Sequence, residues 1–220
     1  MSKKLVVVIL LLLSLSAQSQ IREILEAAKP KKAFEGTPVL QKKSQILSVS
    51  AGTPNKVSNF LDFGGIAPVL FNTSTKKSVG PFMLDYEYLV NDNFGLGLSL
   101  LYASGEQTYS SSLFSDSYTG SINQFQIGLS SYYHIYTTDK LDPYVKGTVG
   151  LNLWNGSYKD NNGNEIPGKT FTAPTPFGLR TLIGLRYFAG KNFAITGEGN
   201  FTVLPKPAVT ANIGVAMKLK

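Results

Sequence analysis

The chain has 220 residues, of which only 16% are charged, and it contains 21 glycines, 11 tyrosines, 13 phenylalanines and no cysteine. The lack of cysteine excludes disulfides, thiolate metal sites and thiol nucleophiles, and the apolar content is too high for a disordered chain. The formal net charge of +7 arises mainly near the N-terminus, because residues 45–220 contain 13 basic and 11 acidic residues. These nearly equal numbers of basic and acidic residues do not form the basic surface of a nucleic-acid-binding protein, and we expect no nucleic-acid partner.

Residues 1–19 have the pattern of a secretory signal peptide. Lys3 and Lys4 precede nine uninterrupted apolar residues at 5–13, and the small residue Ser19 follows. Nine residues are too few to cross about 30 Å of hydrocarbon as a helix, so we predict a leader that is cleaved after Ser19. No later segment has about 18 consecutive apolar residues, so we expect no membrane-spanning helix in the exported chain.

Residues 20–44 form a basic lead-in with six basic and three acidic residues. Apolar residues recur at helical spacing from Ile21 to Ala28, and Pro30 ends the pattern. We therefore expect a short periplasmic helix followed by a flexible polar stretch. The segment is either a solvated tail or an arm that binds a periplasmic partner.

From residue 45 onward the apolar residues alternate with a period of two. Leu96, Leu98 and Leu100, for example, fall on one face of a strand, and Gly95 and Gly97 fall on the other. This alternation is typical of β-strands whose two faces have different surroundings. The eight expected strands are 45–51, 82–90, 94–103, 124–135, 144–154, 177–187, 193–201 and 209–219.

The connections between these strands differ in length. Short turns are expected at 91–93, 138–142 and 189–192, with a brief connection at 205–207, and long polar loops are expected at 52–79, 104–121 and 155–175. Short turns at one end, longer loops at the other and an even strand count are the pattern of outer-membrane barrels. We predict an all-β fold over residues 45–220: an eight-stranded antiparallel up-and-down transmembrane β-barrel with short periplasmic turns and longer extracellular loops.

Alternation alone does not say which face points outward, because a soluble lipocalin-like barrel has the same period around an apolar interior. The polar face is rich in glycine and serine and has few charges, whereas a water-facing surface usually carries about 25–35% charged residues. The apolar face has aromatic residues at both strand ends, with Tyr88 and Phe94 by the short turns and Tyr102 and Phe125 by the loops. Aromatic residues favour the two lipid interfaces, so we assign the polar face to the interior.

Three strand segments and the last strand have distinctive sequences. They are Ser-Ala-Gly-Thr-Pro-Asn at 50–55, Gly-Pro-Phe-Met-Leu-Asp-Tyr-Glu-Tyr at 80–88, Phe-Gly-Leu-Gly-Leu-Ser at 94–99 and the alternating strand 213–219. On these segments the chain resembles the small outer-membrane β-barrel domain family of the OmpX/OmpA type. The resemblance implies a location in the outer membrane, contact with outer-membrane lipid and lipopolysaccharide, and insertion by the barrel-assembly machinery. The family is functionally diverse, so a shared fold says little about activity.

Seven charged residues fall on the expected inward face. An isolated buried charge costs several kcal/mol, so these residues should pair with one another. Eight strands leave almost no free bore, and we therefore expect a charge network that plugs the lumen. A selective conduit through the same residues is the alternative. The seven residues are Asp85, Glu87, Lys146, Arg180, Arg186, Glu198 and Lys218.

The single histidine, His134, is expected on the inward face near the periplasmic end. A lipid-modifying barrel enzyme with a Ser–His–acid set would carry it at the outer rim, and no serine adjoins His134 in a nucleophile-like position. One histidine and no cysteine indicate neither a metal cluster nor a nucleophile–base pair. We therefore expect no enzymatic activity, no metal and no cofactor.

The favoured function is a small structural outer-membrane barrel with a plugged, charged lumen and surface-exposed loops that mediate contacts. The first alternative is an accessory to envelope transport or secretion that docks a periplasmic partner through residues 20–44. A lipid-modifying outer-membrane enzyme and a soluble lipocalin-like barrel are the remaining alternatives. The sequence identifies no ligand, transported solute or protein partner.

Overall fold

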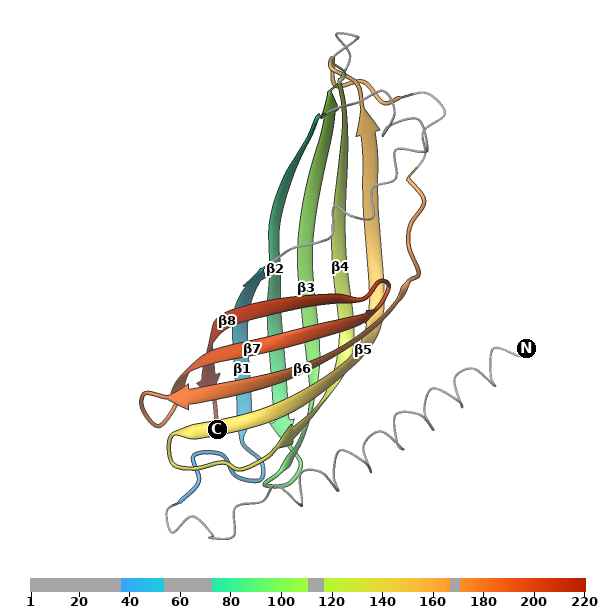
Figure 1. Ribbon diagram of the computed structural model, residues 1–220. Coiled ribbons are helices and arrows are strands. Elements are labelled where there is room, and N and C mark those ends of the chain that lie inside the picture. Colours follow the sequence, from blue (N-terminus) through green and yellow to red (C-terminus); the bar gives the residue numbers. More distant parts are fainter. Residues whose placement is uncertain (1–36, 54–72, 111–116, 167–170) are drawn as a thin grey trace, which may run out of the picture. The chain divides into compact units, whose positions relative to one another are not determined.

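Eight antiparallel strands close into a barrel in which each strand pairs with its neighbours in the sequence and the last pairs with the first (Figure 1). The closed up-and-down topology confirms the predicted fold class, and the strands begin and end close to the expected positions at the turn end of the barrel. The strands are β1 (Gln45–Thr53), β2 (Thr73–Leu89), β3 (Phe94–Ser110), β4 (Ser117–His134), β5 (Leu141–Lys159), β6 (Phe177–Phe188), β7 (Phe193–Leu204) and β8 (Ala208–Lys218).

The computed structural model describes residues 37–53, 73–110, 117–166 and 171–220. The expected signal peptide at 1–19 and the expected helix of the lead-in lie outside these residues. Within the described residues, no helix is long and apolar enough to cross a membrane.

The distribution of side chains over the two faces confirms that the polar face is the interior. Leu98, Leu129 and Ile183 point outward and are at least half exposed, whereas Asp85 and Thr148 point inward and are almost fully buried. Outward-facing apolar residues are what a barrel in lipid requires. A soluble lipocalin-like barrel would need the opposite arrangement, so that alternative is wrong.

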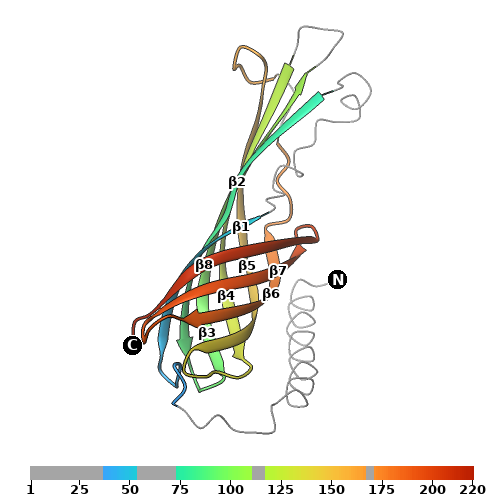
Figure 2. The same cartoon turned by 60° about the vertical axis from the view of Figure 1, so that its left-hand side comes forward.

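Strands β2 to β5 continue well beyond the closed barrel at the end opposite the short turns (Figures 1 and 2). The loops predicted at 52–79, 104–121 and 155–175 are therefore too long. Residues 73–79, 104–110, 117–121 and 155–159 within them are strand residues. The error has a physical reason. Beyond the lipid the outer face becomes polar, so the alternation that marks a membrane strand disappears although the pairing continues, as between Ser104 and Asn123.

The extension begins at a bulge in β2. The register of β2 against β3 shifts between Val79 and Phe82. Gly80 adopts a φ of 81° there, a left-handed conformation that residues with a Cβ rarely adopt. The same Gly80-Pro81 pair stood at a predicted loop boundary, because glycine and proline signal a turn as well as a bulge.

The turn predicted at 138–142 is displaced toward the N-terminus. The connection between β4 and β5 is 135–140, and Asp142 is already part of β5. Thr138 caps the turn: its Oγ1 accepts a hydrogen bond from the backbone N–H of Leu141 at 2.8 Å. Pro143 suggested the beginning of a strand because it lacks an N–H. In the structure it lies two residues inside β5, where its carbonyl accepts from Ile135.

Leu98→Arg should lower the free energy of unfolding in lipid vesicles by about 2–4 kcal/mol, because Leu98 points outward from the middle of the apolar band. Denaturant unfolding of the folded barrel measures this difference. Thr119→Arg is the matched control, because Thr119 lies on the polar part of the extension and should tolerate the charge. Equal stability of Leu98→Arg and the wild type would contradict the assigned faces.

Candidate functional site

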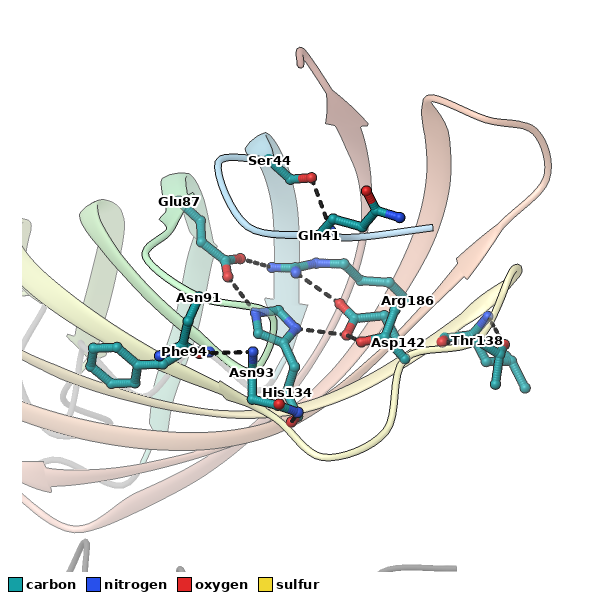
Figure 3. A network of polar contacts seen from close by, with 12 residues as sticks. Gln41, Ser44, Glu87, Asn91, Asn93, Phe94, His134, Thr138, Asp142 and Arg186 are labelled. Atoms are coloured by element: carbon teal, nitrogen blue, oxygen red, sulfur yellow. Dashed lines mark hydrogen bonds and ion pairs between the residues drawn. The ribbon is translucent and has the colours of Figure 1, made fainter. Parts of the chain in front are cut away.

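The interior at the turn end of the barrel holds a closed ring of four charged or polar side chains (Figure 3). The two ring nitrogens of His134 lie 2.6 Å from Glu87 Oε1 and 2.6 Å from Asp142 Oδ1. The Arg186 guanidinium donates to Glu87 Oε2 at 2.7 Å and to Asp142 Oδ2 at 3.0 Å. Thr137 Oγ1 donates a further bond to Asp142 at 3.0 Å. Each carboxylate thus bridges the imidazole and the guanidinium.

The geometry of the ring fits a charged His134. A neutral imidazole has one N–H donor and one acceptor nitrogen, whereas an imidazolium donates from both nitrogens. Both nitrogens of His134 face carboxylate oxygens, which accept hydrogen bonds when ionised. With His134 and Arg186 positive and Glu87 and Asp142 negative, the ring is electrically neutral, as a fully buried cluster should be.

A second group of four charges lies further up the lumen. Lys146 Nζ donates to Asp85 Oδ1 at 2.5 Å, and both side chains are buried. Glu198 accepts hydrogen bonds from the Tyr144 hydroxyl at 2.6 Å and from Asn212 at 3.2 Å. The fourth member, Arg180, completes a balance of two acids and two bases.

Arg180 is held differently from the other interior cations. Its guanidinium donates to Ser99 Oγ at 3.0 Å and contacts the sulfur of Met83, and it is only 4% exposed. No ion pair to Arg180 occurs among the described residues, and its Nε has no hydrogen-bond partner there. The charge is therefore balanced by the cluster as a whole rather than by one carboxylate.

Two buried tyrosines fill the space between the ring and the second group. The Arg186 guanidinium lies over the Tyr144 ring at 4.2 Å from its centroid, and Lys146 Nζ lies 5.3 Å from the centroid of Tyr132. Such cation–π contacts add to the ion pairs in a desolvated interior. Gly184 makes room for Tyr144, because a Cβ there would lie 2.4 Å from the tyrosine Cζ. This is the physical use of the small residues on the polar face.

Residues 38–44 close the turn end of the barrel. Leu40 is 1% exposed and packs with Leu89 and Phe188, which lie two residues beyond Glu87 and Arg186 on the same inward faces. The backbone of Val39 donates to Thr138 O at 2.8 Å and that of Lys43 donates to Leu89 O at 2.9 Å. These residues were expected in a flexible stretch. They form an ordered cap because Leu40 covers the apolar rim of the lumen.

The structure brings six of the seven predicted lumen residues into the two groups and places Lys218 elsewhere. Lys218 is only partly buried, and its Nζ donates to the carbonyl of Val39 at 2.8 Å. It thus ties the last strand to the cap at the rim. The six residues that lie in the groups are Asp85, Glu87, Lys146, Arg180, Arg186 and Glu198.

Sequence reasoning missed Asp142 and the role of His134 as a member of the ring. Asp142 was assigned to a turn. It lies two residues before Tyr144 and four before Lys146, so it falls on the same inward face of the strand, and extending the predicted strand by two residues would have found it. His134 was recognised as inward-facing but was considered only as a catalytic base or a metal ligand. Its position opposite Tyr144 in the β4–β5 register brings it beside Asp142.

The two carboxylates of the ring occupy both nitrogens of His134. His134 is fully buried with both nitrogens bound to carboxylates, so it has no free nitrogen to accept a proton from a nucleophile. Within the described residues, no group of His, Asp and Glu is arranged to hold a metal ion. The chemistry that the arrangement supports is charge neutralisation and filling of the lumen.

The tip of the β5–β6 connection is ordered by its own polar residues. The Asp160 carboxylate accepts from the backbone N–H groups of Asn164 at 2.9 Å and Asn162 at 2.8 Å. These bonds hold the pKa of the exposed Asp160 carboxyl below its ordinary value. The loop therefore uses its carboxylate to fix a turn.

A closed barrel with an apolar exterior and a filled, neutral polar interior is a small outer-membrane β-barrel. A family model described as the outer membrane protein beta-barrel domain matches residues 48–216. The chain therefore belongs to the outer membrane protein β-barrel domain family, and its location is the outer membrane. The surrounding lipid and lipopolysaccharide are its environment. A search of curated proteins finds no match.

Several solved structures of small outer-membrane proteins are similar to this chain. The N-terminal β-barrel domain of Pseudomonas aeruginosa OprF is 14% identical, with a TM-score of 0.46, over 82% of this chain and all of that domain. Ail of Yersinia pestis, solved with the heparin analogue sucrose octasulfate, is 15% identical with a TM-score of 0.46, over 80% of this chain and 98% of Ail. OprG of Pseudomonas aeruginosa is 13% identical with a TM-score of 0.42, over 84% of this chain and 96% of OprG.

Lys146→Met should lower the free energy of unfolding by about 3–5 kcal/mol, because it leaves the buried Asp85 carboxylate without its cation. The double variant Asp85→Asn/Lys146→Met should recover most of that loss, since it removes both charges. Denaturant unfolding in lipid vesicles, followed by the fluorescence of Trp154, measures both differences. A double variant no more stable than Lys146→Met would contradict the assigned pairing.

Proposed function

We propose that the protein is a structural outer-membrane barrel with a closed lumen, whose extracellular extension of β2 to β5 makes contacts at the cell surface. The filled lumen is the observation that carries this proposal. Tyr132, Tyr144, Lys146 and Arg186 are each 1% exposed and project into the space that a channel would need. The cap residue Leu40 covers the same lumen at its periplasmic end.

The ion pairs favour a structural rather than a conducting lumen. An ion that enters must displace side chains from paired contacts of 2.5–3.0 Å, as between Lys146 and Asp85 or between Arg186 and Asp142. Each broken pair leaves a buried charge without a partner, which costs several kcal/mol. A selective conduit through these residues is therefore the weaker proposal. A non-catalytic role is part of the proposal, and the bound state of both His134 nitrogens supports it.

The purified, folded protein should show no stable conductance steps in planar lipid bilayers, because the lumen is filled along its length. A porin reconstituted in the same membranes provides the positive control. Persistent, voltage-stable steps from the wild-type protein would overturn the closed-lumen proposal and favour the conduit.

A second candidate is that the basic lead-in docks a periplasmic partner of an envelope transport or secretion system. The observation that favours it is the anchoring of residues 38–44 to the barrel, with Lys218 bound to Val39 and Leu40 buried. The anchor joins the barrel to a preceding segment, residues 20–37, whose sequence contains four basic residues that a partner could recognise.

Deletion of residues 20–37, with the signal peptide and residues 38–44 retained, tests the second candidate. The expected result is the loss of periplasmic proteins that co-purify with the full-length barrel after crosslinking in cells. A charge-reversed lead-in with Lys29→Glu and Lys31→Glu should have the same effect if charge is what the partner recognises. An unchanged set of co-purifying proteins after the deletion would exclude the second candidate.

A further inference from the structure

The outer face of the barrel changes character between two adjacent rows of side chains. Tyr102, Phe125 and Leu153 form the last apolar row across β3, β4 and β5. The next row outward is Ser104, Asn123 and Asn155. Since aromatic residues favour the lipid–water interface, the last apolar row marks the upper edge of the lipid, and the sheet above it stands among the headgroups of the outer leaflet.

Above this edge the outward side chains of β2 to β5 form a surface that we call the hydroxyl face. Most of them are short, neutral and both donors and acceptors of hydrogen bonds. Its residues, in rows from the lipid edge outward, are Val79, Ser104, Asn123 and Asn155; then Lys77, Glu106, Ser121 and Ser157; then Thr75, Thr108, Thr119 and Lys159; and finally Ser110 and Ser117.

Cross-strand hydrogen bonds fix the positions of the polar groups on the hydroxyl face. Thr108 Oγ1 and Thr119 Oγ1 lie 3.0 Å apart, and Ser121 Oγ and Ser157 Oγ lie 3.1 Å apart. Each hydroxyl has one donor and two acceptor sites, so one such bond leaves capacity for a ligand. The sheet therefore presents ordered hydroxyl groups that lose little conformational entropy on binding.

Charge contributes little to the hydroxyl face. The row next to the lipid edge contains no cation, and Lys77 in the second row lies 3.9 Å from Glu106. Lys159 is in the third row outward. A surface built to bind lipid phosphates would place arginine or lysine next to the lipid edge. The face is suited instead to a neutral ligand that both donates and accepts hydrogen bonds.

The height of the hydroxyl face fits the sugars of a glycolipid. Adjacent rows are two residues apart, which is about 6.7 Å along a strand. With strands tilted by roughly 40°, each row rises about 5 Å above the previous one. The four rows therefore reach about 15–20 Å above the apolar edge, a zone that saccharide units of the outer leaflet occupy.

We propose that the hydroxyl face binds the saccharide of the lipopolysaccharide that surrounds the barrel, through hydrogen bonds rather than through charge. The face continues directly from the lipid-contacting surface, so a glycolipid whose acyl chains lie against Phe125 and Leu153 places its sugars against Asn123, Ser121 and Thr119. This proposal rests on the surface-contact part of the proposed function and names the partner of that surface.

The test compares two glycolipids on the folded, full-length barrel in phosphatidylcholine nanodiscs: lipopolysaccharide with its core sugars, and lipid A without them. The wild type should bind the core-bearing form about tenfold more tightly than lipid A, as a few net hydrogen bonds would give. The preference should be the same at low and high salt, because screening weakens interactions between exposed charges and leaves neutral hydrogen bonds unaffected.

The variant Thr108→Val/Thr119→Val/Ser121→Ala should lose the preference and bind both glycolipids with the affinity that the wild type has for lipid A. Valine keeps the β-branched shape and the strand propensity of threonine. The matched control is Ser131→Ala/Thr181→Val, which removes two outward hydroxyls in the opposite half of the apolar band and should keep the full preference. A second variant, Asn123→Ala/Asn155→Ala, removes the first polar row and should also weaken the preference.

Three results would overturn the saccharide proposal: equal binding of both glycolipids by the wild type, an undiminished preference in the triple variant, or a preference that disappears at high salt. The last would assign the binding to phosphate and lysine. None of these results affects the closed lumen, because conductance tests that part of the proposed function independently.

Discussion

The need to satisfy every backbone hydrogen bond inside lipid is the constraint on which the rest of this structure depends. An unpaired N–H or C=O in hydrocarbon costs several kcal/mol, so the sheet must close, and β1 pairs with β8 to close it. Closure with eight strands creates a narrow interior. Large inward side chains must then fill that interior. Glycines opposite them leave the room they need, as Gly184 does for Tyr144 and Gly95 does for Glu87.

The polar interior solves a second problem, because charges removed from water must be neutralised where they lie. The ring of Glu87, His134, Asp142 and Arg186 and the second group of Asp85, Lys146, Arg180 and Glu198 each balance their own charges. Replacing such groups by apolar residues is often neutral for stability, so their value lies in fixing one register of the strands. Three of the ion pairs join strands that are not neighbours in the sheet: Glu87 pairs with His134 and with Arg186, and Asp85 pairs with Lys146. A register slip would separate these pairs.

The fold followed from the sequence because alternation is a direct consequence of two different environments on the two sides of a strand. It held wherever lipid faced the outside, and it failed above Tyr102 and Phe125, where the outward face becomes polar while the pairing continues. Six lumen charges were found by parity alone. The pairing of these charges could not be predicted, because contacts across the barrel depend on the strand register. Asp142 was missed because Pro143 led us to place it in a turn. The cap at Leu40 escaped prediction because a single apolar residue in a polar stretch carries no periodicity.

The most direct test of whether the chain is a closed barrel in the outer membrane is a gel. It compares the migration of the outer-membrane-extracted protein with and without heating. Closure of β1 on β8 predicts that the unheated protein stays folded in detergent and migrates differently from the heated chain, in the outer-membrane fraction after cell fractionation. A protein recovered from the soluble periplasmic fraction, with the same migration before and after heating, would contradict both the closure in lipid and the assignment of the polar face to the interior.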